Sequence, residues 1–374
     1  MELEPQMQGE DQERPATRDW RHMVANGLYE SGLLRAFQVV SRHCEYASDN
    51  GGDHLRRVQK PKYAVLGYHS VGTHGLPLYC RLPRQVFAEQ MRYIKRHYRV
   101  VSLRQMTEEL EDPKAPGQSV VVTFDDGYLG TYTDAFPVLK DCAIPATIYL
   151  ISGAVESGKL AWYDRVFLGF RSAPSEVTVS LDAPRTFRLT DFASRVDAAT
   201  MVVSYLRTLP DVQRQRWCES FEKAIPVPNA ELLGSMMNWD QAREMCRAGI
   251  SFGCHTITHP VLSRLTPAAL QQEIADSKWL IENRLGVQVD DFAFPFGKPE
   301  DCGSVGSTEM SRVGFRTAMT TIVGINGPGQ DRFRLRRMVQ GEERSIAIFA
   351  YRLQRLFFRP VDEESTSLTS PAQR

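Results

Sequence analysis

The chain has 374 residues, of which 42% are hydrophobic, and this length allows one large α/β domain or two smaller ones. Its 45 Lys and Arg residues balance 45 Asp and Glu residues, so net charge gives no support for a nucleic-acid partner or an anionic membrane surface. Seven scattered cysteines without a C-x-x-C pair argue against a disulfide-stapled secreted domain.

Residues 1–60 predict a disordered polar start, an amphipathic helix and a linker. The acidic N-terminus lacks the basic start and apolar stretch of a secretory signal, so we expect a cytoplasmic protein. No run approaches the roughly 18 apolar residues of a transmembrane helix. Residues 19–43 have helical apolar spacing, which fits packing on the main domain or, alternatively, peripheral membrane association or partner binding.

Short apolar runs alternate with helical patterns through residues 61–345. The runs that predict strands are 63–67, 120–124, 146–151, 250–254, 292–294 and 317–321. The helical patterns between them are 84–98, 134–141, 240–248 and 267–285. This alternation predicts a parallel sheet covered on both faces. Polar residues follow the strand ends and no glycine-rich phosphate motif follows the first strand, so an α/β barrel is favoured over an open sheet.

The pattern changes between about residues 156 and 238, which we interpret as an insertion carried on the barrel. Trp162 and Tyr163 open this insertion. Their rings either pack in the core or stack on the face of a sugar, and both alternatives stay open. Residues 346–374 are expected to form a C-terminal helix followed by a polar tail.

Two adjacent carboxylates, Asp125 and Asp126, directly follow a strand-like run. Gly127 permits a sharp turn after them. Because neighbouring side chains diverge, one carboxylate can bind a cation while the other stays unligated as a base beside a water molecule. Taken alone, an Asp-Asp-Gly sequence is commonly only a turn.

A pair of imidazoles, His255 and His259, follows another strand-like run. If the chain turns helically there, both rings face the same way, although Pro260 disfavours a helix at His259. With one carboxylate, the pair makes a His2Asp set for one divalent metal ion, open to water and substrate. Zn²⁺ in such a site activates water and polarises a carbonyl, which predicts hydrolysis of an amide or ester. Alone, the pair also fits an ordinary helix face.

Three segments together, T-F-D-D-G at 123–127, H-T-I-T-H-P at 255–260 and F-A-F-P-F-G at 292–297, resemble the polysaccharide deacetylase family. This family carries the NodB homology domain and is also called carbohydrate esterase family 4. The resemblance covers roughly residues 63–344, interrupted by the insertion. It implies a distorted (β/α) barrel that removes N-acetyl groups from sugar polymers with one divalent metal, most often zinc.

The resemblance also implies roles for individual residues. Asp125 matches the catalytic base of the family, and Asp126 matches its metal-binding carboxylate. His255 and His259 match the other two protein ligands. Phe296 takes the place of an aromatic residue whose backbone N–H helps to hold the oxyanion.

The chain departs from the family pattern at two positions. Many members have an Arg before the Pro-aromatic element, where this chain has Ala293, and Arg336 or Arg337 is a candidate to reach the base instead. Many members also use a late His as general acid, but no His follows His259. His69, at the end of the first predicted strand, is the candidate acid, with a structural hydrogen-bonded His as the alternative.

The sequence therefore predicts a metal-dependent hydrolase that removes N-acetyl groups from amino-sugar units of a polysaccharide or glycan precursor. Its predicted partner is an N-acetylated glycan. One alternative is an O-acetyl esterase or small-amide hydrolase on the same fold. The other is a non-catalytic protein that binds glycans or takes part in their biosynthesis.

Overall fold

The structure is a computed structural model, and the residues it describes are 61–72, 81–112, 114–227, 235–303, 305–341, 343–359 and 361. The predicted N-terminal helix at 19–43, and with it the predicted membrane association, lies outside the described residues. So does the polar tail from residue 362. None of the described helices is both long and apolar enough to cross a membrane.

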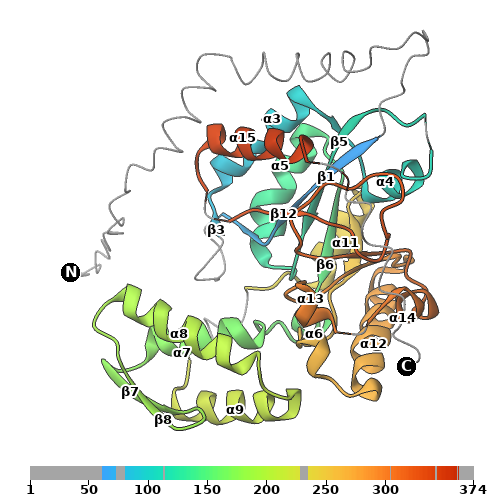
Figure 1. The fold of residues 1–374 in the computed structure, drawn as a ribbon. Coiled ribbons are helices and arrows are strands. Elements are labelled where there is room, and N and C mark those ends of the chain that lie inside the picture. The colour runs from blue at the N-terminus through green and yellow to red at the C-terminus, as the bar shows by residue number, and fades with distance from the viewer. Residues whose placement is uncertain are drawn as a thin grey trace, which may run out of the picture.

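A parallel sheet that curls into a half-barrel forms the centre of the molecule (Figure 1). Its strand order is β11-β10-β9-β6-β5-β1-β12, with β4 beside β5. The strands are β1 (Lys62–Tyr68), β4 (Arg99–Val100), β5 (Gln118–Phe124), β6 (Ala146–Leu150), β9 (Ser251–Cys254), β10 (Asp291–Ala293), β11 (Thr317–Met319) and β12 (Met338–Val339). The long strands β1 and β5 are buried along almost their whole length, as continuous apolar runs in a covered parallel sheet should be. The predicted α/β barrel is confirmed.

The segment 335–340 connects the two edges of this sheet. Its Leu335 N–H donates to Ala318 in β11 at 3.0 Å, and its Gln340 N–H donates to Gly67 in β1 at 2.7 Å. Between these contacts Arg337 is fully buried. The closing segment therefore carries a charged side chain into the middle of the barrel.

Helices pack around the sheet (Figure 1). They are α3 (Arg84–His97), α4 (Leu103–Glu109), α5 (Phe136–Cys142), α6 (Ser152–Ser157), α11 (Trp239–Arg247), α12 (Pro267–Leu285), α13 (Pro299–Cys302), α14 (Ser307–Val313) and α15 (Ile346–Phe357). Shorter elements are strands β2 (Ser70–Val71) and β3 (Arg81–Leu82), a π-helical turn at Thr131–Ala135 and a 3-10 turn at Leu262–Arg264. α12 has the predicted bounds because Thr266 caps its start, Pro267 occupies its first turn and Gly286 ends it at φ 69°.

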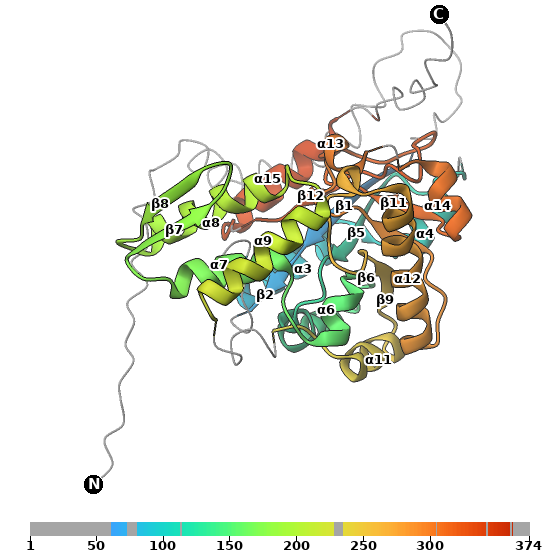
Figure 2. The same ribbon diagram turned by 90° about the horizontal axis from the view of Figure 1, so that it is seen from below.

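Residues 162–224, which follow α6, form a lobe beside the barrel (Figures 1 and 2). It contains α7 (Trp162–Ser172), the hairpin of β7 (Glu176–Ser180) and β8 (Pro184–Arg188), α8 (Phe192–Leu206) and α9 (Asp211–Ala224). The ring of Phe170 packs against Phe187 and Phe221, at centroid distances of 5.6 and 5.2 Å. This aromatic contact joins α7 to the hairpin and to α9.

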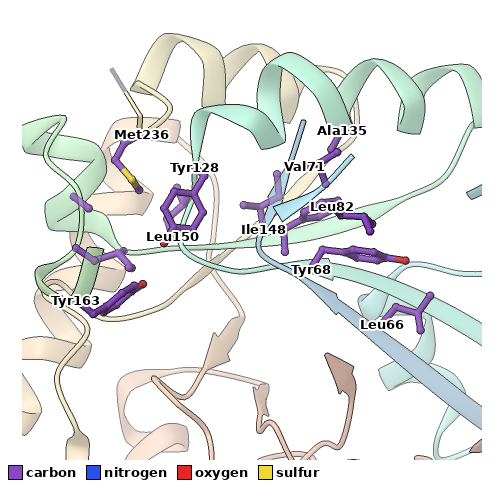
Figure 3. Packing of buried hydrophobic residues seen from close by; sticks show 14 of the residues in the cluster. Leu66, Tyr68, Val71, Leu82, Tyr128, Ala135, Ile148, Leu150, Tyr163 and Met236 are labelled. Atoms are coloured by element: carbon purple, nitrogen blue, oxygen red, sulfur yellow. The ribbon is translucent and has the colours of Figure 1, made fainter. Parts of the chain in front are cut away.

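The hydrophobic core is continuous from the sheet into this lobe (Figure 3). Leu66 and Tyr68 line β1, Leu150 ends β6, and Tyr163 reaches the same cluster from α7. Each fully buried side chain of this size contributes about 1.5–3 kcal/mol through the hydrophobic effect. The lobe is thus packed on the barrel at the end where the strands finish.

Candidate active site

The sequence-predicted site residues meet at the carboxyl end of the barrel. His69 follows β1, Asp125 and Asp126 follow β5, and His255 follows β9. Residues after the strand ends of a closed parallel sheet point into one common space, and active sites of barrel enzymes lie there. The other predicted residues also reach this space: His259 from the loop after β9, Phe296 from the loop after β10, and Arg337 from the segment before β12.

Unusual backbone conformations cluster at this end of the barrel. Five described residues other than glycine have a positive φ, and four of them are Asp126 (72°), Thr256 (67°), His259 (57°) and Phe296 (60°). Such conformations cost about 1–3 kcal/mol each and persist where the surrounding structure holds them. Their concentration here indicates that the fold sets the direction of these side chains at the expense of local stability.

The helical turn considered for His255 and His259 is wrong. The residues after β9 form an irregular loop, in which Thr256 has a positive φ and its hydroxyl accepts the His259 N–H at 3.0 Å. The carboxylate of Glu273 in α12 accepts two further backbone N–H groups of this loop. The two rings still face one cavity, with centroids 4.8 Å apart.

Asp126, His255 and His259 form a buried cluster whose candidate ligand atoms all lie within 4.8 Å of one another. The Asp126 Oδ1 atom is 3.6 Å from His255 Nε2 and 3.9 Å from His259 Nε2. His255 Nδ1 lies 2.7 Å from the Ala293 carbonyl and donates to it as the Nδ1–H tautomer, which leaves the Nε2 lone pair facing Asp126. Among the described residues, the buried Asp126 Oδ1 has no hydrogen-bond partner. This donor set fits a divalent metal ion.

Burial controls the protonation of this cluster. It raises the pKa of Asp126 to about 7 and lowers the pKa of His255 to about 4. It also lowers the pKa of His259 well below its usual value. Both imidazoles are therefore neutral at physiological pH, the form that binds metals, whereas Asp126 needs a nearby positive charge to ionise fully.

Asp125 lies beside the cluster and is held by Arg337. Nη1 and Nη2 of Arg337 donate to the two carboxylate oxygens of Asp125 at 2.7 and 2.6 Å, and its Nε donates to the Thr320 carbonyl at 2.9 Å. Burial alone would raise the pKa of Asp125, but the Arg337 guanidinium and neighbouring groups hold it below the usual range. Of the two candidates, Arg337 rather than Arg336 reaches this carboxylate.

A cavity of about 190 Å³ opens between these groups. His69 lines it with Nε2 3.8 Å from Asp125 Oδ2, and the buried His69 Nδ1 has no hydrogen-bond partner among the described residues. The other lining residues are Asp125, Asp126, Tyr128, Tyr163, His255, His259, Phe294, Phe296 and Thr321. A larger cavity of about 400 Å³ lies between α6, α7 and α9 and contains none of the predicted site residues.

The inserted lobe contributes residues whose role in the site was not predicted. The Trp162 indole N–H donates to the His259 carbonyl at 3.0 Å, and the Tyr163 ring packs 5.0 Å from the His259 ring. Both side chains are buried, which fits the core-packing alternative, and Tyr163 also lines the cavity, so its stacking on a sugar stays a prediction. The adjacent aromatic pair was visible in the sequence, but its contact with the histidine loop was not.

Comparisons with known proteins agree with this architecture. The family model described as polysaccharide deacetylase matches residues 112–303, about half of the chain. "Putative polysaccharide deacetylase YxkH" of Bacillus subtilis (strain 168) is 25% identical over 285 residues, 75% of this chain and 73% of that protein. The poly-beta-1,6-N-acetyl-D-glucosamine N-deacetylase of Staphylococcus epidermidis is 38% identical over 74 residues, 20% of this chain and 26% of that protein.

A solved structure shows the same fold. The Streptococcus pyogenes deacetylase PplD in complex with acetate superimposes with a TM-score of 0.53 at 18% identity. The match covers 81% of this chain and 100% of that chain. The curled barrel described above is therefore common to both proteins.

Proposed function

Because the chain belongs to the polysaccharide deacetylase family, a family of hydrolases, we propose that it removes N-acetyl groups from the amino-sugar units of a glycan. One observation carries this proposal: Asp125 is buried, paired with Arg337 and beside the Asp126, His255 and His259 cluster without belonging to it. A protein that only binds metal or sugar has no need of such a carboxylate, whereas a hydrolase needs a base next to its electrophile.

Asp126, His255 and His259 are the proposed metal ligands. A divalent metal held there, for which Zn²⁺ suits the two-nitrogen, one-oxygen donor set, would polarise the acetyl carbonyl and lower the pKa of water. The buried imidazoles are already in the neutral form that this task requires. The Ala293 carbonyl fixes the orientation of one of them.

The remaining residues handle protons and charge. Asp125 takes a proton from the attacking water, and the Arg337 pair keeps it ionised for this purpose. The Phe296 backbone N–H, which has no hydrogen-bond partner among the described residues, donates to the oxyanion that forms on the acetyl group. His69 gives a proton to the nitrogen as the carbon–nitrogen bond breaks, so that acetate and a free amine leave.

Acetate release from N-acetylglucosamine oligomers tests this proposal. We expect the purified chain to release acetate, to lose at least about 99% of its rate after dialysis against a chelator, and to recover it with added Zn²⁺. O-acetylated oligosaccharides serve as the matched substrate. Faster release from the esters would indicate an O-acetyl esterase, and no release from any substrate would contradict the enzymatic proposal.

His69 as general acid makes a separate prediction. In His69→Gln the rate with an unactivated N-acetyl sugar should fall by about 10²-fold, because no acid at this position protonates the leaving nitrogen. An acetyl ester with a nitrophenolate leaving group needs no protonation and should be hydrolysed at nearly the wild-type rate. Equal losses with both substrates would assign His69 a structural role instead.

A further inference from the structure

Arg207, in the inserted lobe, lies on the turn that carries the Phe296 N–H. It follows α8 directly, and its guanidinium carbon is 4.1 Å from the centroid of the Phe296 ring. Its Nη2 donates to both carboxylate oxygens of Asp301 in α13 at 2.9 Å. Asp301 is almost fully buried, so its carboxylate has little freedom to move and holds the Arg207 guanidinium close to the barrel. A cation held over a ring face in this way is an attractive contact.

The turn beneath Arg207 is strained. Phe296 has φ 60° and Gly297 has φ 70°, and the Gly297 N–H donates to the Pro295 carbonyl at 2.6 Å. A positive φ with an i to i+2 hydrogen bond defines the rare, strained form of the γ-turn. This form persists only where other contacts hold it.

The barrel holds the main chain of the turn through Thr321, whereas the inserted lobe contributes Arg207 to the contacts of its ring. Thr321 donates its hydroxyl to the Phe296 carbonyl at 2.6 Å and its N–H to the Gly297 carbonyl at 3.0 Å. The ring itself packs between Arg207 and the edge of His259, whose ring centroid is 4.7 Å away. Contacts on the ring fix the direction of the Phe296 Cα–Cβ bond, and together with the main-chain hydrogen bonds they hold this residue at its positive φ. If the ring is released, the backbone can relax from this φ, and that change in φ reorients the N–H.

We propose that Arg207 is a positioning residue that fixes the Phe296 turn so that its N–H meets the oxyanion. This inference rests on the proposed deacetylase function. The inserted lobe is then part of the catalytic apparatus, and it acts through Phe296 rather than by touching the acetyl group. The hydrogen bond from the Phe296 N–H to the oxyanion is strongest in the transition state. Losing Arg207 therefore lowers kcat and leaves KM nearly unchanged.

A simpler role for Arg207 would be to fasten the lobe to the barrel through Asp301. Arg207→Lys separates the two roles, because a lysine can pair with the carboxylate but cannot also lay a planar guanidinium on the ring. Under our proposal, Arg207→Lys has the melting temperature of the wild type but a lower kcat. Recovery of both would overturn the proposal.

The decisive experiment combines kinetics with hydrogen exchange. Arg207→Met should lower kcat by about 10- to 100-fold, and deuterium uptake of the peptide covering 294–300 should increase. The double variant with Phe296→Leu should be no slower than Phe296→Leu alone, because both changes act through the same contact. The control is Arg188→Met, which alters a largely exposed arginine of the same lobe and should change neither quantity.

The two proposals fail in distinguishable ways. If the wild-type chain releases no acetate, the deacetylase proposal fails, but the exchange measurement still tests whether Arg207 fixes the turn. If Arg207→Met takes up deuterium no faster than the wild type at 294–300, the positioning proposal is overturned whatever the activity. Additive losses in the double variant would overturn it as well.

Discussion

Asp125→Asn is expected to lower kcat for acetate release by about 10²- to 10⁴-fold while leaving the bound metal in place. The amide cannot accept a proton from the attacking water. Asp125 does not belong to the Asp126, His255 and His259 cluster, so the metal content of the variant should match that of the wild type. Steady-state kinetics and elemental analysis of the same preparation measure the two quantities.

The matched control is the neighbouring carboxylate. Asp126→Asn should lower the metal content and the activity together, because the Asp126 Oδ1 atom lies 3.6 Å from His255 Nε2 and 3.9 Å from His259 Nε2. The two variants differ only in which of two adjacent carboxylates is changed. If Asp125→Asn also lost the metal, the assignment of Asp125 as base and Asp126 as metal ligand would be wrong.

The location of the site could be predicted from the sequence because its signals are local. Asp125 and Asp126 directly follow a buried apolar strand, and so does His255, which places them at one end of a parallel barrel without further knowledge. The same holds for α12, whose cap residues define both of its ends. Residues close together in the sequence were therefore sufficient to predict the position of these elements.

The geometry within the site could not be predicted because it depends on distant contacts. The loop between His255 and His259 takes its shape from Glu273, which lies in a separate helix and accepts two of its N–H groups. Arg207 reaches Phe296 only because the inserted lobe packs on the barrel. No periodicity in the sequence encodes either contact.

The choice between Arg336 and Arg337 shows the same limit. Neighbouring side chains in an extended segment point to opposite sides, so a shift of one residue in register exchanges them. The register is set by pairing of Met338 with Leu66 in β1, a contact across the whole chain. Arg337 thereby enters the barrel, and the Arg336 N–H instead donates to Asn326.

Arg337→Met is expected to move the acid limb of the kcat/KM profile to higher pH. In the wild type, Arg337 holds the pKa of Asp125 below its usual range, so this proposed base stays ionised at acidic pH. Without the guanidinium the burial remains, and burial raises the pKa of a carboxyl group above its ordinary value of about 3.9. Activity should then fall at a higher pH than in the wild type, as measured between pH 4 and 9.

The same substitution should destabilise the fold in a pH-dependent way. A carboxylate with a lowered folded pKa stabilises the protein above its unfolded pKa, and this contribution is lost as the pH falls through the folded pKa. Removing one partner of a buried pair costs about 3–5 kcal/mol at neutral pH. In Arg337→Met the raised folded pKa makes this loss smaller at pH 5 than at pH 7, which urea unfolding at both values would measure.

Arg336→Met is the control for both effects, because it removes a neighbouring guanidinium that does not touch Asp125. It should leave the acid limb of the profile in place and cost much less stability. A pH profile of Arg337→Met that superimposes on that of the wild type would show that the base is kept ionised by something other than this pair. The proposal that Arg337 keeps Asp125 ionised would then be wrong, although the pair is the largest influence opposing the effect of burial on the pKa of Asp125.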